Sequence, residues 1–181
     1  MINSLQTTPG RLLQSAEQSS YDAWIKFYRP DENTANTSIS YYTKGALIGW
    51  MLDAHIRKAT NGAKSLDDLM RLAFNRFSGE KGFTPQAFKS AAEEVAGVKL
   101  ADFFAKNVEA PGELNYDEAL DWFGLRFKNG VASASNGPKK AYIGVASRVD
   151  NGRLIVTRVP RETPAFEAGL NVDDEIIAID D

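Results

Sequence analysis

Apolar residues recur at helical spacing through most of the chain. The stretch from residue 11 to residue 28 predicts one or two amphipathic helices with a break near Ser19 and Ser20. A polar loop follows and ends at Ser40, which is a suitable N-cap for a helix over residues 41–59. Because its apolar side chains fall on nearly every face, this helix is predicted to lie buried at the centre of the fold.

Four more helices are predicted after this one. An acidic first turn follows Ser65, Thr84 stands directly before Pro85 as at many helix starts, and Gly97 is a suitable C-terminal stop. Residues 41–124 therefore predict a helical bundle with short connections. The four segments cover residues 66–77, 85–96, 100–108 and 116–123.

The pattern changes in the last third of the chain. Residues 129–140 are poor in apolar side chains and rich in Gly, Ser and Asn, which is typical of a linker. Beyond them the period becomes two, and Asp150-Asn151-Gly152 predicts a tight turn between two strands. The expected elements are strands over 142–147 and 153–159, a short helix over 164–168 and a strand over 175–179.

These elements predict the fold class and the domain organisation. We expect an α+β protein in which an all-α helical bundle is followed by a β-rich unit. The bundle occupies residues 1–128, the linker residues 129–140 and the β-rich unit residues 141–181.

Composition limits the chemistry that the chain can perform. Its 181 residues include one histidine, His55, and no cysteine, and the formal net charge is −3. A disulfide, a thiol nucleophile and a two-histidine metal site are therefore excluded. The mild acidity argues against nucleic acid or an anionic membrane as a partner, since phosphates require clustered basic residues. The longest apolar run, residues 45–52, is far shorter than the roughly 20 residues that span a bilayer.

The β-rich unit contains an ordered series of short motifs. They are Ala141-Tyr142-Ile143-Gly144-Val145, Val159-Pro160, Thr163-Pro164-Ala165, Ala168-Gly169-Leu170 and Asp174-Glu175-Ile176-Ile177-Ala178-Ile179. This series resembles the first half of a PDZ domain of the bacterial protease type.

The PDZ resemblance implies capture of a peptide C-terminus. In that family, backbone N–H groups of the loop around Ile143, Gly144 and Val145 receive the terminal carboxylate, and the next strand pairs with the peptide. Gly144 suits this role because a residue without Cβ lets backbone donors approach a ligand. The chain ends before the second helix and the later strands of such a domain, so we expect the peptide groove to be incomplete.

A second series of motifs lies in the helical part. It comprises Tyr42-Thr43-Lys44-Gly45-Ala46, Leu66-Asp67-Asp68-Leu69, Gly82-Phe83-Thr84, Ala96-Gly97 and Leu100-Ala101-Asp102-Phe103-Phe104. Together with the PDZ-like unit, it resembles the glycyl aminopeptidase family of gluzincin metallopeptidases, whose members carry a C-terminal PDZ domain. The resemblance covers most of residues 8–180, and we expect the chain to be truncated at both ends relative to the family.

This second resemblance implies zinc as the cofactor of a longer parent protein. In the family, a His-Glu-x-x-His helix and a later Glu hold the zinc, and the first Glu drives a zinc-bound water onto the peptide carbonyl. This chain contains no His-Glu-x-x-His sequence, and His55 has no histidine four residues away. We therefore expect no metal ligands in this chain, no bound zinc and no catalysis by the chain alone.

Tyr42 is the catalytic position that the resemblance transfers to this chain. It matches the tyrosine that stabilises the tetrahedral intermediate, and a phenol with a pKa near 10 stays protonated at neutral pH and can donate to an oxyanion. The alternative is an aromatic side chain packed at the start of a buried helix, and Tyr41 competes for the assignment. Lys44 is expected to orient the helix start, to pair with an acid or to be solvated. His55 is expected to be hydrogen-bonded or half-exposed.

The predicted function is that of a fragment of a zinc-dependent aminopeptidase-like protease. The fragment supplies the oxyanion-stabilising tyrosine and a PDZ module. The alternative is a non-enzymatic peptide-binding or scaffold protein with a degenerate peptidase domain. The expected partners are peptide or protein substrates, and peptide C-termini at a completed PDZ domain. The resemblance indicates a bacterial protein, cytoplasmic or periplasmic, and the sequence leaves the compartment open.

Overall fold

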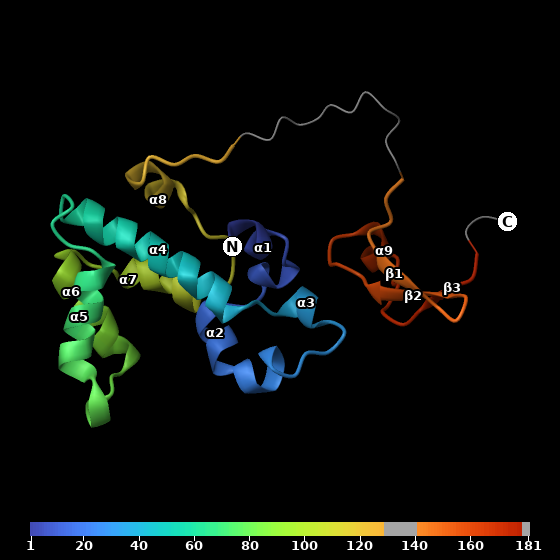
Figure 1. Ribbon diagram of the computed structural model, residues 1–181, viewed down its shortest axis with the longest axis horizontal. Coiled ribbons are helices and arrows are strands. Elements are labelled where there is room, and N and C mark those ends of the chain that lie inside the picture. Colours follow the sequence, from blue (N-terminus) through green and yellow to red (C-terminus); the bar gives the residue numbers. More distant parts are fainter. Residues whose placement is uncertain (129–140, 179–181) are drawn as a thin grey trace.

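The structure is a computed structural model that describes residues 1–128 and 141–178. The predicted linker over residues 129–140, and Ile179 at the end of the last predicted strand, lie outside the described residues. Helices fill the first part, and a small antiparallel sheet with one short helix fills the second (Figure 1). This arrangement confirms the predicted α+β class.

Helix α4 (Tyr41–Ala59) has the bounds that its sequence predicts. The Ser40 hydroxyl accepts a hydrogen bond from the Thr43 N–H at 3.3 Å, and Thr60 follows the last turn. One face of α4 packs into a hydrophobic cluster with Leu5, and another face packs into a second cluster with Leu69. The prediction of a central, buried helix is therefore confirmed. Its buried residues are Lys44, Leu47, Ile48, Met51, Leu52, Ala54 and Ile56.

The segment before α4 is more broken than the sequence predicts. Its elements are α1 (Ile2–Gln6), the 3-10 helix η1 (Pro9–Leu12), α2 (Ala16–Tyr21), the π-helix η2 (Ala23–Phe27) and α3 (Thr34–Thr37). The break predicted near Ser19 and Ser20 lies slightly later, because α2 runs through both serines and ends at Tyr21, and η2 begins at Ala23. Ser15 caps α2 by accepting from the Gln18 N–H at 3.0 Å, and Ser19 satisfies its hydroxyl on the distant Ile39 carbonyl.

The helices after α4 begin and end close to the predicted residues. The Asp68 carboxylate accepts from the Ser65 N–H at 2.9 Å, as in a capping box, and Gly97 ends its helix with a φ of 70°. Among the described residues, no helix has the length and apolar character needed to cross a membrane. The elements are α5 (Leu66–Phe77), η3 (Gly79–Lys81), α6 (Pro85–Ala96), α7 (Ala101–Phe104), the π-helix η4 (Ala105–Glu109) and α8 (Asp117–Trp122).

The C-terminal unit contains an antiparallel sheet of order β1-β2-β3. Its elements are β1 (Ala146–Asp150), β2 (Arg153–Arg158), α9 (Pro164–Glu167) and β3 (Glu175–Ile176). Asn151 and Gly152 form the predicted turn with φ of 50° and 79°. The predicted strand start at Tyr142 is wrong, because the Ile143 carbonyl accepts from the Ala165 N–H at 2.9 Å and the segment packs on α9 instead of pairing.

Asn36 of α3 joins the helical part to the C-terminal unit. Its Nδ2 donates to the Val159 carbonyl at 2.9 Å, and its Oδ1 accepts from the Arg161 N–H at 2.9 Å. The side chain is buried, so both hydrogen bonds are sheltered from water. The Asn36 side chain thus donates one hydrogen bond to the backbone that follows β2 and accepts another from it, as a neighbouring strand would.

Candidate functional site

Tyr42, the candidate catalytic residue, lies in the first turn of α4 and faces solvent. The residue is 60% exposed, whereas Lys44, two positions later, is completely buried. The cap hydrogen bond between Thr43 and Ser40 fixes the helix start on which Tyr42 stands. Tyr42 is therefore not a residue of the core, and its hydroxyl can be reached from outside.

Buried hydrogen bonds hold the segment that leads into Tyr42. The Ile39 N–H donates to Gln14 Oε1 at 3.0 Å, and Ser19 Oγ donates to the Ile39 carbonyl at 2.7 Å. Gln14, Ser19 and Ile39 are all buried, so these polar groups depend on one another for hydrogen bonds. Hydrogen bonds therefore tie the backbone just before α4 to Ser19 of α2 and to Gln14, which lies two positions after η1. These contacts fix the position of Tyr42.

Three phenol groups meet at the start of α4. Tyr28 Oη lies 3.0 Å from Tyr41 Oη and 3.1 Å from Tyr42 Oη, so it hydrogen-bonds to both. The Tyr41 and Tyr42 rings are 4.2 Å apart between centroids, and Phe27 packs edge-on against Tyr41 at 5.5 Å. Tyr28 follows the last residue of η2, so this short π-helix delivers it to the cluster.

The two tyrosines of α4 differ in acidity. The hydrogen bond with Tyr28, aided by the contact with Tyr42 and by burial, raises the pKa of Tyr41 above its ordinary value. The hydrogen bond with Tyr28, aided by the contact with Tyr41, lowers the pKa of Tyr42, and burial opposes this only in part. Tyr41 therefore holds its proton more tightly than Tyr42 does.

Lys44 is buried, so the interpretation of a solvated lysine is wrong. Its Nζ donates to the Gly112 carbonyl at 3.4 Å, close to the Glu113 carboxylate, which forms an ion pair with Arg11 at 2.8 Å. Burial lowers the pKa of Lys44, and the negative charge of Glu113 offsets part of this effect. Lys44 thus ties the start of α4 to the loop before α8 and lies near an acid.

Replacing Lys44 by methionine is expected to raise the free energy of unfolding near neutral pH by about 1–2 kcal/mol. Methionine fills a similar buried volume and carries no charge to desolvate. The lowered pKa means that, from that pKa up to about 10.4, the unfolded chain binds more protons than the folded chain, so wild-type stability rises with pH. The gain from Lys44→Met should therefore shrink across this window.

Urea unfolding of both proteins near neutral pH and at about pH 10 measures the two effects. A loss of stability in Lys44→Met at neutral pH would show that the contacts with Gly112 and Glu113 outweigh desolvation.

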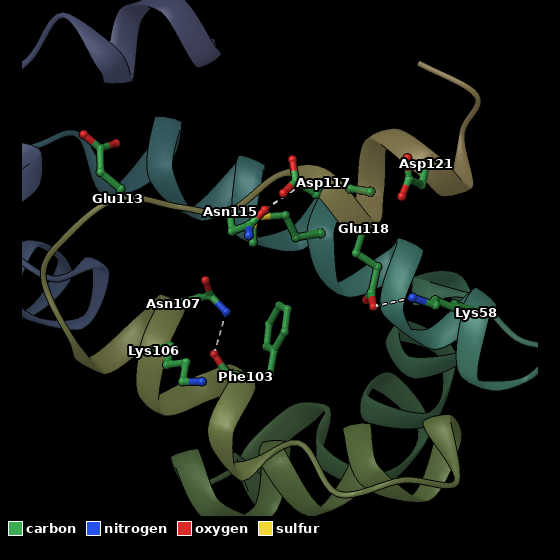
Figure 2. Close-up of a pocket in the computed structure, with 11 residues that line it drawn as sticks. Lys58, Phe103, Lys106, Asn107, Glu113, Asn115, Asp117, Glu118 and Asp121 are labelled. Atoms are coloured by element: carbon green, nitrogen blue, oxygen red, sulfur yellow. Dashed lines mark hydrogen bonds and ion pairs between the residues drawn. The ribbon is translucent and has the colours of Figure 1, made fainter. Parts of the chain in front are cut away.

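A cavity of about 510 Å³ lies between α4, η4 and α8 (Figure 2). Glu118 points from α8 toward α4, where it binds Lys58 Nζ at 3.0 Å and His55 Nδ1 at 2.6 Å. Burial raises the pKa of the Glu118 carboxyl, but the hydrogen bonds with Lys58 and His55 outweigh it and the net pKa is lowered. His55 is therefore hydrogen-bonded and half-buried, as the sequence predicts.

The described residues do not fit a zinc ion. Across residues 1–128 and 141–178, no group of three or more His, Asp or Glu side chains is arranged to hold a metal. His55, the single histidine of the chain, is already bound to Glu118. No step of a zinc-dependent reaction can therefore be built on the described residues.

Ile143, Gly144 and Val145 lie just before β1, where the sequence predicts the carboxylate-binding loop. Gly144 is buried with a φ of 79°, and a Cβ on it would stand 2.3 Å from Thr163 Cβ. Packing and backbone conformation thus require glycine here, whether or not a ligand approaches the loop. The N–H groups of Ile143, Gly144 and Val145 have no acceptor within the described part of the chain.

Strand β1 forms an edge of the described sheet. It pairs with β2 alone, and all five of its residues are exposed. A register irregularity lies between Ala146 and Ser147, next to the loop. The outer edge of β1 presents backbone groups with which an extended peptide can pair.

The residues that support Tyr42 carry no sequence signal of their own. Tyr28 fits the apolar pattern of its segment, while Gln14 and Ser19 are ordinary polar residues near predicted helices. Their partners lie 13 to 25 positions away along the chain. Only the folded arrangement shows that they belong to the site.

Comparisons with known proteins point to a peptidase-related protein. The family model for M61 glycyl aminopeptidase matches residues 1–48, a segment that includes Tyr42. The chain is also similar in structure to an aminopeptidase N family protein from Idiomarina loihiensis, with a TM-score of 0.70 and 26% sequence identity. That match covers 98% of this chain and 33% of the other, so the chain spans about a third of that protein. No curated protein matches the chain.

Proposed function

We propose that this chain is the helical C-terminal part of a zinc-dependent aminopeptidase-like protease, followed by part of a PDZ domain. The observation that carries the proposal is the exposed Tyr42 hydroxyl at the start of α4, inside the segment that resembles M61 glycyl aminopeptidases. The activity belongs to a longer protein in this proposal, because the chain matches only 33% of its structural neighbour.

Tyr42 is suited to stabilise the intermediate of peptide hydrolysis. Attack on the peptide carbonyl creates a negatively charged oxygen, and a fixed donor aimed at that oxygen typically contributes about 10²–10³ in rate. The Tyr42 hydroxyl is exposed, while Gln14 and Ser19 fix the backbone that leads to it. A donor held in place before the reaction needs no reorganisation when the charge develops.

Zinc enters this proposal only through the longer protein. The ion supplies Lewis acidity and an activated water when it is bound. Because the described residues do not fit a metal ion, the ligands belong to another part of that protein. The task left to this chain is to place the oxyanion donor.

The PDZ-like unit supplies peptide binding in this proposal. Unpaired N–H groups at Ile143, Gly144 and Val145 suit a terminal carboxylate, and the adjacent edge of β1 suits the peptide that carries it. The loop leads directly into β1, so the carboxylate site and the peptide-binding edge are continuous along the chain.

A non-enzymatic peptide-binding or scaffold protein is the second candidate function. The exposed edge of β1 favours it, since this strand can bind a peptide whether or not catalysis occurs. In a scaffold, the rest of the longer protein would lack the zinc ligands.

Hydrolysis of glycyl p-nitroanilide in the presence of zinc tests the proposal. The assay compares this chain with a longer chain translated from the same reading frame, and a metal chelator serves as the control. We expect no turnover by this chain and chelator-sensitive turnover by the longer one. An inactive longer chain with a substituted His-Glu-x-x-His sequence would support the scaffold. Turnover by this chain alone would contradict the placement of zinc outside it.

A further inference from the structure

Tyr28 occupies the central position among the three phenol groups. A phenol carries one proton, so it can donate one hydrogen bond while its oxygen accepts others. Tyr28 Oη lies within hydrogen-bond distance of both Tyr41 Oη and Tyr42 Oη. It therefore donates to at most one neighbour and accepts from the other. The direction of this short chain decides where the Tyr42 proton points.

Exposure and acidity both favour a hydrogen-bond chain that runs from Tyr41 through Tyr28 to Tyr42. Tyr42 is the more exposed of the two α4 tyrosines, so its proton can be directed outward, whereas the half-buried Tyr41 finds its acceptor within the cluster. The raised pKa of Tyr41 fits a hydroxyl that donates to Tyr28, and the lowered pKa of Tyr42 fits an oxygen that accepts from Tyr28. Among the described residues, Tyr28 and Tyr41 are the titratable groups that act on Tyr42.

We propose that Tyr28 is a positioning residue for Tyr42, accepting from Tyr41 and donating to the Tyr42 oxygen. The Tyr42 hydroxyl is then left with its proton directed out of the cluster, toward the position of an oxyanion. The inference rests on the proposed role of Tyr42 and adds the residue that orients and polarises it.

The arrangement strengthens Tyr42 as a donor in two ways. Each hydrogen bond in a chain polarises the next, so an oxygen that accepts from Tyr28 makes its own O–H a better donor. Because Tyr42 accepts from Tyr28, it cannot at the same time donate its proton to Tyr28. The proton therefore remains available to hydrogen-bond the substrate. Phe27 packs against Tyr41 at 5.5 Å and against Tyr42 at 6.2 Å, and it supports both rings.

The direction can be measured on this chain without any enzymatic assay. The protein contains six tyrosines, so 13C labelling at the ring carbon that bears the hydroxyl gives six NMR signals whose pH titrations can be followed separately. We expect Tyr28→Phe to raise the pKa of Tyr42, because the ring remains while Tyr42 loses the hydrogen bond that Tyr28 donates to it. Tyr21→Phe is the matched control, since Tyr21 is 89% exposed and should leave the Tyr42 titration unchanged.

An unchanged or lowered pKa of Tyr42 in Tyr28→Phe would overturn the inference, provided that circular dichroism shows the same fold. In the longer protein, Tyr28→Phe is expected to lower kcat about three- to tenfold with little change in KM. This is the effect expected for the loss of one neutral hydrogen bond to Tyr42. If the pKa of Tyr42 rises but neither Tyr28→Phe nor Tyr42→Phe changes kcat, the hydrogen-bond direction stands and the proposed function of Tyr42 fails.

Discussion

Replacing Tyr42 by phenylalanine in the longer, zinc-dependent protein that we propose is expected to lower kcat by about 10²–10³, with a much smaller effect on KM. The substitution removes the donor for the oxyanion and keeps the ring. Because the hydroxyl donates mainly to the charged oxygen of the intermediate, its loss raises the barrier and hardly weakens the bound substrate. Steady-state kinetics on a glycyl substrate separates the two parameters.

Tyr41→Phe provides the matched control for this prediction. It removes the same atom from the neighbouring residue of the same helix turn, at a hydroxyl that the hydrogen bond with Tyr28 holds inside the cluster. We expect a change in kcat of less than about tenfold, because only one hydrogen bond of the chain is lost. An equal loss in both variants would assign the effect to the whole cluster, and an unaffected kcat in Tyr42→Phe would return Tyr42 to a structural role.

The stability of the fold should not limit this comparison. Tyr42 is exposed and its hydroxyl hydrogen-bonds to the exposed Tyr28, so its removal leaves no buried polar group unpaired. Thermal unfolding of the two variants, measured by circular dichroism, should therefore give midpoints close to that of the parent.

The helical part could be predicted well because helix ends carry local signals. The Ser40 and Thr84 hydroxyls accept from N–H groups three residues ahead, and Gly97 takes the left-handed conformation that glycine favours. Each of these interactions involves atoms within one turn of chain, so the sequence order alone contains them. The sequence does not give the exact end of α2 in the same way, since the Ser19 hydroxyl binds Ile39, twenty positions away, and the helix continues to Tyr21.

The β-rich unit shows where periodicity is ambiguous. Residues 142–145 alternate as a strand does, yet they run along α9 because Gly144 is left-handed and its missing Cβ makes room for Thr163. An irregular segment that packs on a helix can show the same alternation as a strand in a sheet, so the pattern cannot separate them. The turn at Asn151 and Gly152 was predictable, because its positive φ values require those residue types.

The residues of the candidate site also differ in whether a local motif identifies them. The motif identifies Tyr42, and the structure supplies its exposure and its neighbours. The sequence does not identify Tyr28, Gln14 and Ser19, because no short stretch brings them together. The sequence is compatible with several roles for Lys44, and only its burial decides against solvation.

Gly10 supports the start of α4 from a distant position in the chain, and no local motif marks it. Its backbone packs directly on Ser38, three residues before α4, and a Cβ on Gly10 would stand 2.2 Å from the Ser38 carbonyl oxygen and 2.5 Å from its nitrogen. Both neighbours are backbone atoms, so no flexible side chain can move aside. Ser38 is also joined directly to Ile39, which Gln14 and Ser19 hold by hydrogen bonds.

Gly10→Ala is therefore expected to lower the free energy of unfolding by about 2–3 kcal/mol, the usual cost of a forced backbone shift in a packed site. Gly45→Ala is the opposite control: Gly45 lies inside α4, nothing stands within 4 Å of an added Cβ, and alanine should stabilise the helix by about 0.5–1 kcal/mol. Urea unfolding of both variants measures the difference.

The same pair of variants separates support of the site from general stability. In Gly10→Ala the shift must pass through Ser38 to the start of α4, so the Tyr42 NMR signal should move even under conditions in which the variant is fully folded. If Gly10→Ala is as stable as the parent and Tyr42 keeps its signal, the close approach of Gly10 and Ser38 does not fix the start of α4. If the signal moves together with a loss of stability, the packing of η1 against the chain before α4 is what holds the candidate oxyanion donor in place.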